Sequence, residues 1–113
     1  MKVLQIGELT IPIPIIQGGM GIGISLSGLA SAVANAGGIG VIAAVGVGLI
    51  HGSPKKSYKQ NNNEGVAREI RRARKLTSGI LGINIMSVLT NYKELVEKLK
   101  NLKSMIRADK KSD

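Results

Sequence analysis

The feature that most constrains this chain is an uncharged, glycine-rich stretch from residue 14 to residue 44. It reads PIIQGGMGIGISLSGLASAVANAGGIGVIAA, and no charged residue occurs between Glu8 and Lys55. A transmembrane helix needs about 20 consecutive apolar residues, whereas Gln17, several serines and Asn35 interrupt every such window here. The glycine content is also too high for a stable helix of that length. We therefore expect a buried core and no membrane span.

The uncharged stretch begins with a candidate strand and is preceded by another. Residues 3–6 predict a short strand, followed by a turn over residues 7–12. Residues 13–17 are apolar, β-branched and few, which is typical of a buried strand. Pro14 places that strand at a sheet edge or at its own start. The glycines of residues 18–23 would make a poor helix but a compliant loop.

A helix and a further strand complete the stretch. After the loop, apolar residues recur at helical spacing. Either Ser25 or Ser27 is expected to be the N-cap, and Gly37 is expected to end the helix in a left-handed conformation. Residues 39–44, IGVIAA, predict a second buried strand, and a glycine-rich loop follows over residues 45–54.

The second half of the chain carries nearly all of the charge. Residues 53–65 are polar and predict a mobile loop, and an amphipathic helix is expected from about residue 64 to 76. Residues 78–88 predict a third buried strand. Asn91 is expected to cap a third helix, and residues 107–113, RADKKSD, predict a disordered tail.

The predicted elements alternate strand and helix three times. Short apolar strands without alternation, separated by amphipathic helices, indicate a parallel sheet covered by helices. We therefore predict an α/β chain in which residues 1–106 form one structural unit and residues 107–113 a disordered polar tail.

Composition excludes several kinds of chemistry. The chain has no cysteine and one histidine, His51. Disulfides, thiolate zinc sites and cysteine nucleophiles are excluded. A single histidine also makes a histidine metal site or a Ser-His-Asp triad an unfavoured interpretation. His51 is expected to be a solvated residue of the loop after the second strand. The start of the chain lacks the pattern of a secretory signal, so a cytoplasmic protein is expected.

The formal net charge of +9 raises the possibility of a nucleic-acid partner. The basic residues are spread over two helical patterns and the tail, however, and no recognised binding motif accompanies them. The chain has only two aromatic residues, Tyr58 and Tyr92, which leaves little for base stacking. We expect no specific nucleic-acid partner, and we interpret the arginine-rich face of residues 64–76 as the solvated side of an amphipathic helix.

The glycine-rich loop after the first buried strand is the main candidate for chemistry. Such a loop lets a ligand approach the backbone and exposes N–H groups that can hold an anion. A P-loop needs a lysine that is missing here, and the spacing in GGMGIGIS does not fit a Rossmann fingerprint. The residues alone also allow the loop to be only a tight turn that permits close helix packing.

Three segments together resemble a known family. PIIQGGMGIGIS, LASAVANAGGIGVIAA and EIRRARKLTSGILGINIM are similar to the amino-terminal part of the nitronate monooxygenases, formerly 2-nitropropane dioxygenases. The resemblance covers about residues 5–95. It implies a TIM barrel that holds FMN at the carboxyl ends of its strands, with the three strand-helix units here as the first three of eight. It also implies oxidation of an alkyl nitronate or a related small molecule by O₂.

Family roles transfer only where the motifs match. The resemblance implies that the loop after the first strand and the end of the third strand contact FMN, through Gly18, Gly19, Met20, Gly21, Asn84 and Met86. Each of these residues also has a purely structural interpretation. The glycines can serve a tight turn, the methionines can fill a core, and the asparagine can cap a neighbouring backbone.

The chain also departs from the family pattern. A TIM barrel takes about 250 residues, and the resemblance places the catalytic histidine and the FMN phosphate loops in later strands. We therefore assign no catalytic and no metal-binding residue. We expect a truncated, inactive segment with weak or no FMN binding, whose open sheet edge favours self-association. The alternatives are part of a flavin-dependent enoyl-acyl-carrier-protein reductase and a non-catalytic remnant or association module.

Overall fold

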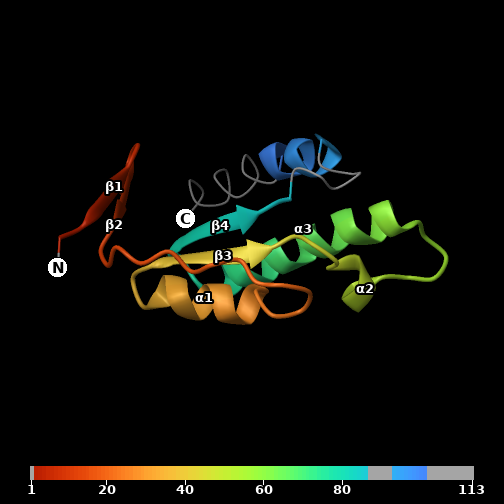
Figure 1. Cartoon of the computed structure of the whole chain (residues 1–113), viewed down its shortest axis with the longest axis horizontal. Helices are drawn as coiled ribbons and strands as arrows, with labels where there is room; N and C mark the ends of the chain where they lie inside the picture. The colour runs from red at the N-terminus through yellow and green to blue at the C-terminus, as the bar shows by residue number, and fades with distance from the viewer. Residues whose placement is uncertain (1, 87–92, 102–113) are drawn as a thin grey trace.

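Two buried parallel strands organise the chain. A computed structural model describes residues 2–86 and 93–101. Its elements are β1 (Leu4–Ile6), β2 (Leu9–Ile11), α1 (Ser27–Asn35), β3 (Ile39–Ala43), α2 (Gly48–His51), α3 (Tyr58–Leu76), β4 (Ile80–Asn84) and a helix over residues 93–101 (Figure 1). Strands β3 and β4 pair in parallel from Ile39↔Ile80 to Ala43↔Asn84.

The predicted strand over residues 13–17 lies along the other edge of β3. Ile16 forms a parallel bridge with Ile39. The Ile39 N–H donates to the Ile15 carbonyl at 2.9 Å, and the Gln17 N–H donates to the Ile39 carbonyl at 3.1 Å. The segment is extended but forms a single bridge with β3, so it is not a full strand. The predicted alternation of extended segment and helix is confirmed, and so is the α/β fold class.

The N-terminal residues form a hairpin, so the predicted turn over residues 7–12 is wrong. Strand β2 occupies residues 9–11 and pairs antiparallel with β1. The reversal is confined to Gly7 and Glu8, and Gly7 has a φ of 57°, which glycine tolerates best. Ile11 is fully buried and packs with Ile39 and Val41 on one face of the sheet. The hairpin therefore covers part of the sheet face that the helices leave open.

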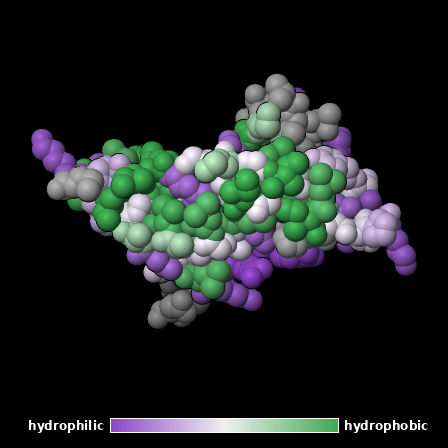
Figure 2. Space-filling view, turned by 60° about the horizontal axis from the view of Figure 1, so that its bottom comes forward, coloured by the Kyte–Doolittle hydropathy of each residue, from purple (hydrophilic) through white to green (hydrophobic). Residues whose placement is uncertain are grey.

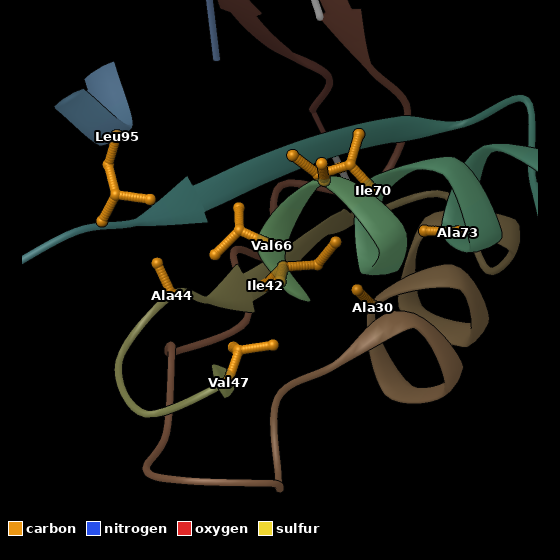
Figure 3. Close-up of a cluster of buried hydrophobic side chains, with 9 residues drawn as sticks. Ala30, Ile42, Ala44, Val47, Val66, Ile70, Ala73 and Leu95 are labelled. Carbon is orange, nitrogen blue, oxygen red and sulfur yellow. The ribbon is translucent and has the colours of Figure 1, made fainter. Parts of the chain in front are cut away.

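The helices cover the opposite face of β3 and β4. Figure 3 shows this core, which contains Ala30, Ile42, Ala44, Val47, Val66, Ala67, Ile70, Ala73 and Leu95. Burial of each large aliphatic side chain contributes about 1.5–3 kcal/mol. Helix α1 lies directly on β3. The two backbones are so close that a Cβ at Gly40 would overlap the carbonyl oxygen of Ala30. No helix in the described part of the chain is long and apolar enough to cross a membrane.

The start of α1 is capped from outside the helix. The predicted serine N-cap is wrong, because the N-cap residue is Leu26 and its side chain makes no capping bond. Instead, the buried Glu69 of α3 accepts hydrogen bonds from the Ser27 N–H and the Ser27 hydroxyl, both at 3.0 Å. A carboxylate is stabilised at a helix N-terminus by the helix dipole. The predicted end of the helix is confirmed, since Gly37 has a φ of 104°.

Helix α3 begins earlier than its apolar pattern suggests. Residues 53–65 were predicted to be a mobile loop, whereas the helix starts at Tyr58. Ser57 and Gln60 form a capping box in which each side chain accepts from the other residue's N–H group, both at 3.2 Å. These two bonds satisfy backbone donors that the first turn would otherwise leave without partners.

Asn62 fixes the connection between β3 and α3. Its buried side chain accepts from the Gly48 N–H and donates to the Ala44 carbonyl, both at 3.1 Å. The connection contains the short helix α2, so the prediction that residues 45–54 form only a loop is wrong, and His51 is the last residue of α2. Asparagine has a low helix propensity, but the contacts from Asn62 to the backbone outweigh it.

The third strand and helix follow the predicted order. Strand β4 is shorter than the predicted residues 78–88, and residues 93–101 are helical. The expected N-cap Asn91 and the predicted tail at residues 107–113 lie outside the described residues. The buried side chain of Leu95 joins the main core, so this helix is anchored to the same sheet face as α3.

Candidate functional site

The glycine-rich loop leaves the sheet immediately after Gln17. At that point the Val41 N–H donates to Gln17 Oε1 at 3.1 Å, and Gln17 Nε2 donates to the Val41 carbonyl at 3.1 Å. The side-chain amide thus takes the place that the next peptide group of a continuing strand would occupy. The ladder continues through the side chain while the main chain departs.

Ser25 marks the return of the loop to the sheet. Its fully buried hydroxyl accepts from the Met20 N–H at 2.8 Å and from Gln17 Nε2 at 3.1 Å. Its carbonyl accepts from the Ala43 N–H at 2.8 Å. Gln17 and Ser25 therefore hold together the two ends of the loop over residues 18–24.

The loop reaches across to β4. Asn84 Nδ2 donates to the Gly19 carbonyl at 3.4 Å, and a Cβ at Gly19 would lie 2.6 Å from the Asn84 Cβ. Asn84 is held in turn by its own carbonyl, which accepts from the Ala44 N–H at 3.0 Å. Two of the predicted cofactor-binding residues, Gly19 and Asn84, are thus in contact although β3 lies between their segments.

A second connection contacts the same loop. Gly46 follows β3, and a Cβ there would lie 2.6 Å from Ile22 Cγ1. A Cβ at Gly23 would lie 3.1 Å from the Ile50 side chain. The connections after the first extended segment and after β3 therefore meet at the carboxyl ends of the parallel strands, where α/β proteins bind ligands.

Gly18 and Gly21 stand apart from the glycines that packing explains. Neither has a positive φ, and a Cβ at either position would meet nothing within 4 Å. Within residues 2–86 and 93–101, the N–H groups of Gly18, Gly19 and Gly21 have no hydrogen-bond acceptor. The loop therefore offers backbone donors and open space beside them. Its sequence contains no charged residue, so these amides supply its polarity.

Apolar side chains of the loop and of the segment that follows β4 are exposed. Met20 is 55% exposed and Met86, just beyond β4, is 47% exposed, so packing in a core does not account for either. Ile22 and Ile24 of the same loop are also exposed. Hydrophobic residues form a broad band across the molecular face shown in Figure 2. The loop thus combines amide donors with an apolar surface.

Sequence reasoning did not identify Gln17 as a residue that shapes this site, and it treated Ser25 only as a candidate N-cap. A signal was present, because Gln17 is the only polar side chain within PIIQGGM and a polar residue in a buried strand requires partners. The identity of those partners, Val41 and Ser25, depends on tertiary structure.

The fold and loop together define an α/β unit with a candidate ligand-binding edge at the carboxyl ends of its parallel strands. The sequence model of the nitronate monooxygenase family matches residues 2–110, and the chain belongs to that family. The matched segment is thus a nitronate monooxygenase-like oxidoreductase region. A search of curated proteins found no match.

Proposed function

We propose that residues 18–21, with Asn84 and Met86, form one wall of an FMN site in a nitronate monooxygenase. The observation that carries the proposal is the pair Gly18 and Gly21, which neither backbone conformation nor packing requires to be glycine. Beside them lie amide donors without acceptors in the described part of the chain. Close approach of a flat ligand to the backbone accounts for both features.

The chemistry of the loop suits a flavin. An isoalloxazine ring has broad apolar faces and an edge of carbonyl oxygens and ring nitrogens that accept hydrogen bonds. The half-exposed Met20 and Met86 side chains suit the faces, and the N–H groups of Gly18, Gly19 and Gly21 suit the edge. Asn84 positions Gly19 through its hydrogen bond to the Gly19 carbonyl. We assign these residues binding and orientation, and no proton-transfer role.

When bound, FMN supplies the redox chemistry by which an alkyl nitronate is oxidised with O₂. The barrel that would complete the site is part of the same proposal. It rests on the family match and on the parallel strands, at whose carboxyl ends the connections after residues 13–17 and after β3 meet as they would in a TIM barrel.

Titration of FMN with the purified chain, followed by flavin fluorescence, tests the proposal. Gly21→Ala places a methyl group in open space and is expected to weaken FMN binding by about tenfold. Gly28→Ala is the matched control, since Gly28 also has open space around its Cβ position but lies on α1. Equal FMN affinity of Gly21→Ala and Gly28→Ala would contradict the proposal.

A substrate assay separates the two related oxidoreductase activities. Nitronate-dependent O₂ consumption supports a nitronate monooxygenase. NAD(P)H oxidation that requires an enoyl thioester would instead indicate an enoyl-acyl-carrier-protein reductase. A chain that binds no FMN and shows neither activity would fit a non-catalytic association module.

A further inference from the structure

A groove between α3 and the helix over residues 93–101 is lined almost wholly by charged side chains. These are Glu64, Arg68, Arg71, Arg72, Lys75 and Lys98. Five of the six are basic. It lies on the outer side of α3, because Val66, Ile70 and Ala73 of that helix face the core.

The basic residues of α3 form a continuous stripe. Residues 68, 71, 72 and 75 follow the spacing i, i+3, i+4, i+7, which places them on one helix face. At 1.5 Å per residue the stripe is about 10 Å long. Like charges at these spacings destabilise a helix, so the stripe opposes the stability of α3. An anion in the groove would relieve that repulsion.

The two helices carry four acidic side chains, and only Glu64 lines the groove within the described part of the chain. Three of them form ion pairs with lysines outside the groove: Lys56–Glu64 at 2.8 Å, Lys59–Glu94 at 3.9 Å and Lys100–Glu97 at 3.6 Å. The fourth, Glu69, is buried and bonded to Ser27. The hydrogen bond from Lys56 also holds the pKa of Glu64 below its usual value, so Glu64 stays charged and paired.

We propose that this groove binds a ligand that carries two or more adjacent phosphate groups. Guanidinium groups bind phosphate oxygens in bidentate geometry, and the stripe is too long for one phosphate to contact all of it. No aromatic side chain lines the groove, which favours a small polyphosphate over a single-stranded nucleic acid that stacks its bases. The groove is formed by helices, so the proposal is independent of the FMN site.

Calorimetric titration of the full chain with tripolyphosphate, at constant ionic strength, tests the proposal. The double variant Arg71→Gln/Arg72→Gln is expected to weaken binding by about tenfold or more. The matched control is Lys2→Gln/Lys55→Gln, which removes the same charge from exposed residues that do not line the groove. The control is expected to change the affinity by less than about twofold.

Each other outcome overturns a stated part of the proposal. Equal losses in the two double variants would mean that net charge alone attracts the ligand. Equal affinity for inorganic phosphate and tripolyphosphate would exclude a site for adjacent phosphates. Tighter binding of a single-stranded oligonucleotide, lost in Arg71→Gln/Arg72→Gln, would assign the groove to nucleic acid instead. No binding of tripolyphosphate to the unmodified chain would refute the proposal.

Discussion

Gly19 and Asn84 meet across the carboxyl end of β3: the Asn84 side chain donates to the Gly19 carbonyl, and a Cβ at Gly19 would lie 2.6 Å from the Asn84 Cβ. The contact joins the glycine-rich loop to β4. It therefore sets the position of the backbone to which we assign FMN binding.

Replacing Gly19 with alanine is expected to destabilise the chain by about 1–3 kcal/mol, the usual cost of an overpacked contact. Asn84 has little freedom to retreat, because its carbonyl is bonded to the Ala44 N–H. Urea unfolding measures the effect. In Gly28→Ala the new methyl group meets nothing within 4 Å, and this control should equal or exceed the unmodified chain in stability. A Gly19→Ala variant of unchanged stability would refute the contact.

Gln17→Leu is expected to leave the buried Val41 N–H and carbonyl without their side-chain partner, at a cost of about 1–3 kcal/mol for each group. Hydrogen exchange of the Val41 amide measures the change directly and should become faster. Gln5→Leu serves as the control, because the hydrogen bonds of Gln5 are exposed. Unchanged protection of the Val41 amide in Gln17→Leu would show that the side chain does not continue the ladder.

Asn62→Asp keeps the shape of the side chain but replaces the donor to the Ala44 carbonyl with an oxygen. The buried carboxylate should destabilise the chain by about 2 kcal/mol or more at neutral pH. Asn35→Asp removes a similar donor to the Leu76 carbonyl at an exposed position, and its effect should be below about 1 kcal/mol. Thermal unfolding compares the two variants. Equal losses would contradict the role of Asn62 in holding the connection after β3.

Lys56→Gln is expected to alter how stability depends on pH. The hydrogen bond from Lys56 lowers the pKa of Glu64, so the pair stabilises the fold above the ordinary carboxyl pKa. This contribution is lost as the pH falls through the lowered folded-state pKa. The stability difference between the unmodified chain and Lys56→Gln should therefore shrink towards acid pH. Lys55→Gln should show no such trend, and a constant difference for Lys56→Gln would contradict the assignment.

The order of the elements was predictable because it depends on local signals. Apolar runs such as residues 39–44 and the helical spacing over residues 64–76 are properties of short windows. The capping of α1 was not predictable, because Glu69 is 42 residues from Ser27 in sequence. The early start of α3 could have been recognised from Ser57 and Gln60, whose spacing is that of a capping box.

The candidate site was predictable to a similar extent. Glycines after one strand and an asparagine at the end of another indicate one edge of a parallel sheet, which is where Gly19 and Asn84 meet. The roles of Gln17 and Ser25 were not predictable, since each depends on which backbone groups the fold brings alongside.

The hydrogen bonds that Gln17 and Ser25 make have a consequence for how this protein can change. The sheet edge is complete without any backbone bond from residues 18–24 to β3. Substitutions at Gly18 and Gly21, where an added Cβ would meet nothing within 4 Å, can therefore alter the proposed FMN-binding surface without a clash in the scaffold, whereas Gly19 is fixed by its contact with Asn84. The ligand preference that we propose for this loop can therefore diverge without a new fold.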